Sequence, residues 1–209
     1  MPSALIALFV VLTAYLLGSI SFALVSSRLF GLADPRSYGS KNPGATNVLR
    51  SGNKSAAILT LFGDAAKGWL AVFLVQKFGS EFGLGTAVTG LVALAVFFGH
   101  LFPVFLKFKG GKGVATAAGV LLALDPWLAL ATLGTWLFIA ITLRYSSLAA
   151  LVAAATAPIY AGLLWGNNGL VLTVGIIAVA LVGKHWQNLQ RLMAGSEPKL
   201  GTKKKPAKH

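Results

Sequence analysis

The sequence contains no cysteine and carries little charge for its length. Without cysteine, disulfides, thiolate metal sites and a cysteine nucleophile are excluded. Only 11% of the 209 residues are charged, whereas soluble proteins carry about 25%. Acidic residues are the scarcest, five against 18 lysines and arginines. Hydrophobic residues make up 56% of the chain and the mean hydropathy is +0.76, a composition typical of integral membrane proteins.

The long apolar runs predict an all-α fold, a polytopic membrane helix bundle. A transmembrane helix needs about 20 apolar residues, so six or seven passes fit the chain. The expected segments are residues 4–28, 56–77, 86–106, 114–124, 126–143, 146–165 and 170–186, with the last continuing as a helix to residue 193. The fourth segment, residues 114–124, is only about 17 Å long against a hydrocarbon core of about 30 Å, and whether it fully spans the membrane stays open.

Charge placement decides whether residues 113–143 form one broken pass or two around Asp125-Pro126, where a helix should break. With two passes, sixteen of the eighteen basic residues fall in loops on one side of the membrane, and Lys77 alone faces the other side. The remaining one, Lys67, lies inside the second segment. The positive-inside rule then predicts seven transmembrane segments, with the N-terminus outside and the C-terminus cytoplasmic.

The same rule explains the net charge of +13 as loop asymmetry at a membrane, so no nucleic acid partner is expected. We expect one integral membrane domain over residues 1–198. Residues 199–209 form a polybasic tail, interpreted as a cytoplasmic anchor near anionic lipid. The predicted location is the cell (inner or plasma) membrane, multi-pass, with the polar loops on the cytoplasmic face.

The first polar constellation is residues 39–50, GSKNPGATNVLR. Asn42 followed by Pro43 predicts a helix N-cap and first helical residue, and Gly52 is suited to end that helix. Its N-terminal amides and hydroxyls are suited to an oxyanion, and an arginine offers a planar fork for phosphate. The alternative is a capped interfacial helix with one snorkelling arginine. The candidate site residues here are Ser40, Thr46, Asn47 and Arg50.

The second constellation is residues 99–116, GHLFPVFLKFKGGKGVAT. A glycine-rich turn before a helix directs backbone N–H groups toward one point, which favours an anion, and lysine adds a mobile charge. It is not a Walker A loop, because Leu106 stands where that motif needs glycine and Gly113 where it needs a hydroxyl, so no Mg²⁺–nucleotide site follows. The alternative is a flexible inside loop with positive-inside lysines. The candidate ligands are Lys109, Gly110, Gly111, Lys112 and Gly113.

The third constellation is His185, Asn188 and Arg191, whose spacing places all three toward one side of a helix. Histidine suits proton chemistry near neutral pH, although an amphipathic exit from the last span explains the pattern equally well. The pair Asp64 and Lys67 lies inside a membrane helix, where ionisable residues are functional candidates, and we expect it to support the site. His100, at a helix end, is interpreted as structural.

The seven-segment topology brings the three constellations to one face, rich in cations and poor in acids. Such a site favours a polyanionic ligand, and its position at a membrane suggests a second, apolar substrate. No metal or cofactor is predicted.

These motifs resemble the bacterial membrane acyltransferase family that moves a fatty acyl group from acyl phosphate to glycerol 3-phosphate. Residues 39–50, 99–116 and 185–199 are similar to its three motifs in order, and Asp64–Gly68 is similar to a further pattern of the family. Lys41 stands where the family commonly has glycine.

The resemblance implies synthesis of 1-acyl-glycerol 3-phosphate, or lysophosphatidate, in phospholipid biosynthesis. It implies that Ser40, Thr46 and Arg50 handle acyl phosphate, and we place the glycerol 3-phosphate phosphate on Lys112 and the glycine amides. His185 and Asn188 then position the attacking hydroxyl or the phosphate, with Arg191 assisting electrostatically. Whether His185 or a donor phosphate oxygen takes the hydroxyl proton stays open.

Two alternatives and one partner accompany this interpretation. Phe105 and Gln190 stand five residues after His100 and His185, where a rival acyltransferase class has aspartate, so acyl-CoA or acyl-carrier-protein donors are disfavoured. A membrane transporter of an organic phosphate, using the same basic loops, is the alternative from another functional class. The expected partners are the two substrates, the lipid bilayer and the soluble enzyme that makes acyl phosphate.

Overall fold

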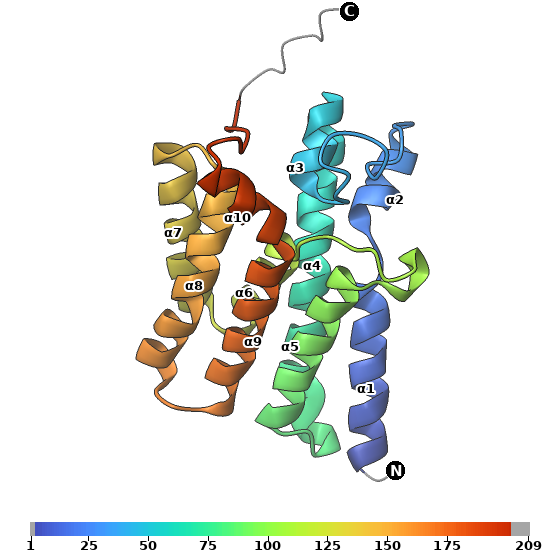
Figure 1. Cartoon of the computed structure of the whole chain (residues 1–209). Helices are drawn as coiled ribbons and strands as arrows, with labels where there is room; N and C mark the ends of the chain where they lie inside the picture. The colour runs from blue at the N-terminus through green and yellow to red at the C-terminus, as the bar shows by residue number, and fades with distance from the viewer. Residues whose placement is uncertain (1–2, 202–209) are drawn as a thin grey trace, which may run out of the picture.

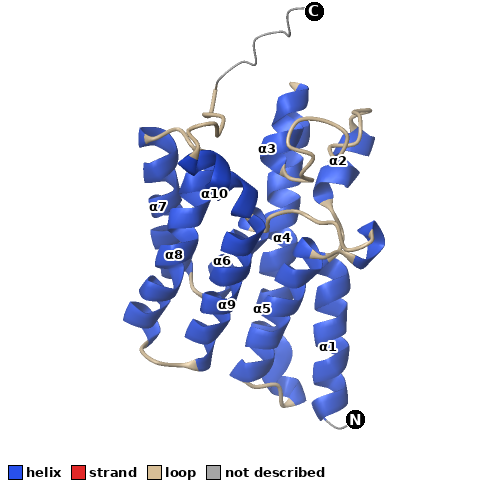
Figure 2. Cartoon of the chain, in the orientation of Figure 1, coloured by secondary structure: helices blue, strands red, loops and turns tan. Residues whose placement is uncertain are grey.

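The computed structural model describes residues 3–201, and every regular element in that range is helical. Figure 1 shows the helices packed side by side in a bundle, and Figure 2 shows that only loops join them. The polybasic tail expected from residue 199 lies outside the described residues from position 202 onward. The helices are α1 (Ser3–Gly18), α2 (Phe22–Leu29), α3 (Ala45–Val48), η1 (Leu49–Ser51), α4 (Lys54–Phe78), η2 (Gly79–Phe82), α5 (Thr86–Leu101), η3 (Val104–Leu106), α6 (Val114–Leu124), α7 (Pro126–Thr142), α8 (Ser146–Trp165), α9 (Gly169–Lys184) and α10 (Trp186–Met193).

Within residues 3–201, three helical stretches, namely α4 with η2, α5 with η3, and α8, are each long and apolar enough to cross a membrane. The count reaches five if the bent pairs α1–α2 and α9–α10 are each one span. The two remaining apolar helices, α6 and α7, are shorter, with 11 and 17 residues. Each predicted segment therefore has a helical counterpart, while the seven-span count stays a prediction.

The first predicted span is not one helix over residues 4–28. The chain bends by 44° between α1 and α2, and Ser21 has extended backbone angles (φ −92°, ψ 106°) just before α2. No proline marks the break, so an apolar run alone did not reveal it. The carbonyl oxygen of Ile20, which has no helical partner at the break, accepts a hydrogen bond from Lys67 Nζ at 2.6 Å. This bond matters because lipid offers the carbonyl no hydrogen-bond donor.

One other expected helix also differs. The helix expected to run from residue 170 to 193 bends by 59° where α9 passes into α10, with His185 at the joint. The third apolar stretch covers residues 86–106 as expected, but α5 ends at Leu101 and η3 completes the stretch, because Pro103 lacks an N–H and its ring disfavours helix in the residue before it. Both interruptions place polar motifs at helix ends.

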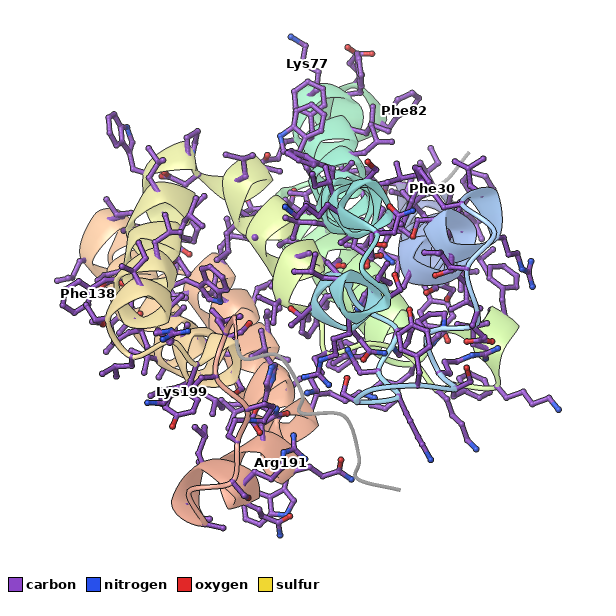
Figure 3. The ribbon with its side chains drawn as sticks, turned by 90° about the horizontal axis from the view of Figure 1, so that it is seen from above. Phe30, Lys77, Phe82, Phe138, Arg191 and Lys199 are labelled. Atoms are coloured by element: carbon purple, nitrogen blue, oxygen red, sulfur yellow. The ribbon has the colours of Figure 1, made fainter. Side chains whose placement is uncertain are left out.

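Small residues allow the helices to approach closely. In a membrane the hydrophobic effect does not drive helices together, so close van der Waals packing must hold them. A Cβ added to Gly119 of α6 would lie 1.9 Å from the Ala65 carbonyl oxygen of α4, so only glycine fits there. The interior core contains Val72, Val96 and Phe97. Large apolar side chains also cover the outside, such as Phe138, which is 66% exposed and lies at the periphery in Figure 3.

The three polar constellations lie toward one end of the bundle. In Figure 1, α3 and α10 lie toward the end opposite to the start of α1, and the loop after η3 crosses the bundle between them to reach α6. Figure 3, viewed from that end, shows Arg191 and Lys199 in the same region. The juxtaposition expected from the topology is therefore present in the fold.

Candidate active site

The first constellation folds around the side chain of Asn47, which is only 2% exposed. Its Oδ1 accepts the backbone N–H of Ser40 at 2.9 Å. Its Nδ2 donates to the carbonyl oxygens of Pro35 at 2.6 Å and Tyr38 at 3.2 Å. In this geometry Asn47 shapes the loop that presents Ser40, while direct contact between Asn47 and a substrate stays a prediction.

The helix in this constellation begins later than expected. Its N-cap is Gly44 rather than Asn42, and Pro43 lies buried before the helix. The expected ending is confirmed, because Gly52 has a left-handed conformation with φ +88°. The side chains of Ser40, Thr46 and Arg50 lie on residues exposed to solvent, as a ligand-binding loop requires.

The position of Lys41 has a conformational explanation. Its φ is +56°, in the left-handed region that glycine enters without steric cost and other residues rarely occupy. Glycine, which the resemblance implies for this position, is therefore the residue that the backbone favours. The lysine therefore differs from the expected glycine in backbone conformation, and no reacting side chain is replaced.

The second constellation, the glycine loop over residues 110–113, is packed tightly against the end of α5. The Gly111 N–H donates to the His100 carbonyl oxygen at 3.2 Å, so this one of the expected anion-binding amides points into the protein. A Cβ at Gly111 would lie 2.2 Å from His100 Nε2, which explains the glycine. Gly113 caps α6 with φ +87°, again left-handed. Lys109 is exposed beside this turn.

Lys112 connects the glycine loop to the third constellation. Its Nζ donates to Asn188 Oδ1 at 2.5 Å, and Asn188 is 5% exposed. Asn188 Nδ2 donates to Glu197 Oε1 at 2.6 Å. Because an ammonium only donates and a carboxylate only accepts, these two neighbours define the orientation of the Asn188 amide. The second and third motifs therefore meet through direct hydrogen bonds.

Glu197 and Ser147 belong to this cluster, although neither was named as a site residue from the sequence. The carboxylate of Glu197 accepts from Ser147 Oγ at 2.7 Å and from Arg191 Nε at 2.6 Å, besides Asn188. Although partial burial opposes ionisation, these hydrogen bonds and the Arg191 charge hold the pKa of Glu197 below its ordinary value. The signal available in the sequence was Glu197 itself, one of five acids and inside the third motif.

The cluster remains positively charged overall. Burial lowers the pKa of Lys112 to about 8; the charge of Glu197 opposes this, and the charges of Arg191 and Arg50 add to it. The influence of Arg50 shows that the first motif lies within electrostatic reach of the other two. Lys112 and Arg191 near one carboxylate, with Arg50 adding positive charge at longer range, favour an added anion.

His185 is buried at the joint between α9 and α10, with 3% of its surface exposed. Its Nδ1 lies 2.9 Å from the Leu181 carbonyl oxygen, which can only accept a hydrogen bond. The Nδ1 atom therefore carries a proton, and Nε2 is the acceptor of the neutral ring. This tautomer suits a residue that accepts a hydrogen bond from a hydroxyl or a protonated phosphate.

Among residues 3–201, no group of three His, Cys, Asp or Glu side chains could hold a metal ion. What the cluster does offer is hydrogen-bond donors: the Lys112 ammonium and the Arg191 guanidinium lie beside Asn188 and Glu197, and the first motif adds exposed hydroxyls and Arg50. Such donors suit phosphate groups, and they lie at the end of an apolar bundle.

A family model described as glycerol-3-phosphate acyltransferase matches residues 8–195 of the chain. A protein of that name from Dechloromonas aromatica is 69% identical over 192 residues, covering 92% of this chain and 95% of the relative. Another, from Janthinobacterium sp. strain Marseille, is 64% identical, covering 93% and 96%. The chain belongs to the glycerol-3-phosphate acyltransferase family. It is thus an acyltransferase, and the resemblance of its three motifs is confirmed.

Solved structures of this acyltransferase family have the same fold. The crystal structure of PlsY (YgiH), an integral membrane glycerol 3-phosphate acyltransferase, in its glycerol 3-phosphate form, is 39% identical to this chain with a TM-score of 0.87. The structural alignment covers 94% of this chain and 96% of the PlsY chain. The lysophosphatidic acid form of PlsY has a TM-score of 0.85 at 38% identity, with the same shares covered. The acyltransferase fold is therefore an integral membrane helix bundle.

Proposed function

We propose that this chain transfers a fatty acyl group from acyl phosphate to glycerol 3-phosphate, giving 1-acyl-glycerol 3-phosphate and inorganic phosphate. The observation that carries the proposal is the contact of Lys112 with Asn188, within reach of Arg50 and Arg191. It joins the second and third motifs at an end of an apolar bundle, and the charge of Arg50 adds the first motif at longer range. The glycerol 3-phosphate and lysophosphatidic acid forms of PlsY match the proposed acceptor and product.

The proposed arrangement assigns one phosphate to each side of the cluster. Lys112 and the glycine-loop amides other than that of Gly111 hold the phosphate of glycerol 3-phosphate. Ser40, Thr46 and Arg50 hold the phosphate of the acyl donor, and Arg191 adds positive charge. Asn188, whose amide is oriented by Glu197, positions the acceptor. This division separates two like-charged ligands and brings their reacting ends together.

The reaction then needs no covalent enzyme intermediate. The acceptor hydroxyl oxygen bonds to the acyl carbonyl carbon, and the bond between that carbon and the phosphate oxygen breaks. The phosphate departs with the electron pair, and the cluster stabilises its growing charge. The hydroxyl proton passes either to an oxygen of the departing phosphate or to His185 Nε2, and the proposed reaction can proceed with either acceptor.

Several finer features complete the proposal. The chain lies in the cell (inner or plasma) membrane as one domain of seven segments, with its N-terminus outside and the site on the cytoplasmic face. A soluble enzyme that makes acyl phosphate supplies the donor from that side. Supporting this orientation, sixteen of the eighteen basic residues fall on one side in the seven-segment arrangement.

The test is a turnover assay on purified protein in detergent or vesicles. We expect phosphate release and lysophosphatidate only when acyl phosphate and glycerol 3-phosphate are both present. Acyl-CoA in place of acyl phosphate should give no product. Flux of glycerol 3-phosphate across vesicles without chemical turnover would instead support the organic-phosphate transporter and refute the enzyme.

A further inference from the structure

Beneath the glycine loop, three ionisable side chains are buried together inside the bundle. Asp64 and Lys67 of α4 are each 2% exposed, and His100 of α5 is 6% exposed. Lys67 Nζ lies 2.9 Å from Asp64 Oδ1, and His100 Nδ1 lies 3.4 Å from the same oxygen. Burying such groups in a membrane protein is costly, so a cluster of this kind needs a compensating role.

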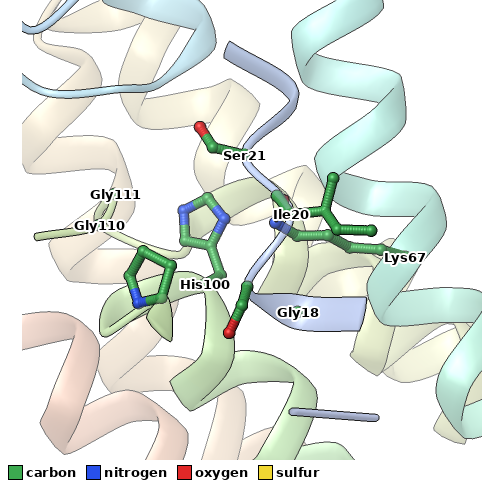
Figure 4. Close-up of a pocket in the computed structure, with 9 residues that line it drawn as sticks. Gly18, Ile20, Ser21, Lys67, His100, Gly110 and Gly111 are labelled. Carbon is green, nitrogen blue, oxygen red and sulfur yellow. Dashed lines mark hydrogen bonds between the residues drawn. The ribbon is translucent and has the colours of Figure 1, made fainter. Parts of the chain in front are cut away.

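The two ends of this cluster reach segments of irregular backbone. On one side, Lys67 Nζ donates to the Ile20 carbonyl oxygen, at the break between α1 and α2. On the other, the His100 ring contacts the glycine loop, where a Cβ at Gly111 would meet Nε2 at 2.2 Å. Figure 4 shows the His100 ring between the break at Ile20 and the loop at Gly111, with Lys67 extending toward Ile20.

The imidazole of His100 therefore contacts a different segment at each of its two ring nitrogens. Its Nδ1 edge faces the carboxylate of Asp64, and its Nε2 edge faces Gly111. The same Gly111 position would meet the Pro43 carbonyl oxygen at 3.1 Å, so the glycine lies between α5 and the first motif. The next residue is Lys112, which reaches Asn188. A rigid planar ring below Gly111 thus controls how far the loop sinks toward the membrane.

We propose that Asp64, Lys67 and His100 form a positioning cluster for the acceptor site. The Asp64–Lys67 pair orients the His100 ring, and the ring supports Gly111 at the height that places Lys112 opposite Asn188. These residues do not touch the reacting atoms. The inference rests on the proposed placement of the glycerol 3-phosphate phosphate on Lys112, and it adds to that placement the residues that determine it.

Two substitutions of His100 separate positioning from simple charge compensation. In His100→Gln, the side-chain amide nitrogen takes the place of Nε2, so the edge toward Gly111 is kept and the edge toward Asp64 is lost. In His100→Asn, the shorter amide takes the place of Nδ1, so the contact with Asp64 is kept and the support of the loop is lost. Both variants keep a polar side chain in the buried cluster.

We expect His100→Asn to raise the KM for glycerol 3-phosphate by up to roughly 10- to 100-fold, the range for losing the charged hydrogen bond that Lys112 makes to the phosphate, with a smaller rise in His100→Gln. The KM for acyl phosphate should change by less than the acceptor KM in both. If His100→Asn keeps the wild-type acceptor KM, or if His100→Gln is the worse of the two, the cluster serves α4–α5 packing alone and the inference is wrong.

A matched control is Thr60→Val on the same α4 helix. Thr60 is fully buried, and its Oγ1 lies 2.6 Å from Ser26 Oγ of α2, a polar tie between helices away from the glycine loop. We expect this variant to lower the melting temperature while leaving the acceptor KM unchanged. A KM rise equal to that of His100→Asn would attribute the effect to general loosening of the bundle and overturn the inference.

The direct link to Gly111 is measured by a double-mutant cycle. Gly111→Ala alone should raise the acceptor KM, because its Cβ collides with His100 Nε2. In a His100→Ala background the collision is absent, so the added effect of Gly111→Ala should be at least several-fold smaller. Equal effects in both backgrounds would contradict the proposal.

Binding is followed separately from turnover through the rise in melting temperature that glycerol 3-phosphate causes in the full chain. If the wild type shows this rise but no turnover, the proposed reaction fails while the positioning cluster is still tested by the His100 variants. If the wild type turns over and the variants bind glycerol 3-phosphate like the wild type, the reaction stands and the positioning cluster is refuted.

Discussion

At the scale of single residues, Lys112 is the side chain on which the proposed acceptor site depends most. Removing the ammonium in Lys112→Ala should raise the KM for glycerol 3-phosphate roughly 10- to 100-fold, the range expected for losing a charged hydrogen bond of about 1.5–3 kcal/mol. The turnover rate at saturation should change less. Lys54→Ala, an exposed lysine at the start of α4, serves as the charge-matched control. An unchanged acceptor KM in Lys112→Ala would show that the phosphate binds elsewhere.

The lowered pKa of Lys112 predicts a pH dependence of acceptor binding. Burial lowers that pKa to about 8, so the cation is present below pH 8 and is lost as the pH rises through that value. The KM for glycerol 3-phosphate should therefore increase between pH 7 and pH 9.5, with bound phosphate moving the midpoint upward. Lys112→Arg keeps its charge over this range and should flatten the rise. The same rise in the arginine variant would assign it to another group.

Lys41 provides a test of backbone strain. Its φ of +56° favours glycine, so Lys41→Gly should leave the melting temperature unchanged or raise it, since relief of roughly 1 kcal/mol or more of left-handed strain offsets the added freedom of the unfolded chain. The control is Lys54→Gly, which places glycine in the first turn of α4 and should cost about 0.5–1 kcal/mol. Equal losses of stability in the two variants would show that the backbone at Lys41 is not strained.

At the scale of helices, the close approach of α4 and α6 determines how the short sixth helix is held. Gly119→Ala would place a Cβ 1.9 Å from the Ala65 carbonyl oxygen and force the helices apart. We expect a loss of about 1–3 kcal/mol, typical of overpacking, seen as a lower melting temperature. The control, Gly134→Ala on α7, meets no atom within 4 Å and should be neutral or stabilising. A similar loss in both would show that helix packing is not the cause.

Helix boundaries were the least predictable elements, and the reasons are local. A helix was expected to break at Asp125-Pro126, and α6 ends at Leu124 while α7 begins at Pro126, with Asp125 capping the Trp127 and Leu128 amides. The break after α1 has no such marker, because residues 19–21 are compatible with a continued apolar helix. It is stabilised by a lysine 47 positions away in the chain, and no local pattern contains that information.

At the scale of the whole molecule, the seven-segment topology predicts which ends face the cytoplasm. Because the chain has no cysteine, single cysteines can be labelled without background. Ser80→Cys, in η2 near Lys77, should react with a membrane-impermeant maleimide in intact cells. Ser196→Cys, after α10, should react only after the membrane is opened. Labelling of Ser196→Cys in intact cells, or protection of Ser80→Cys, would refute the orientation.

The sequence by itself determined the class of protein, the three motifs and the chemistry they serve. Those properties depend on composition, charge asymmetry and contiguous polar runs, which can be recognised without long-range contacts. It also indicated that Lys112, Asn188 and Arg191 belong to one anion site, because the topology brings their loops to one face.

Only the tertiary structure decided how these residues are held. Glu197 was recognisable as a rare acid, yet its partner Ser147 lies 50 positions away on α8. His100 appeared as a lone helix-end histidine, and only the fold places it between Asp64 on α4 and Gly111 on the glycine loop, the observation behind its proposed role. The physical reason is the cost of burying polar groups: each must find a partner, and the fold alone determines which distant residue supplies it.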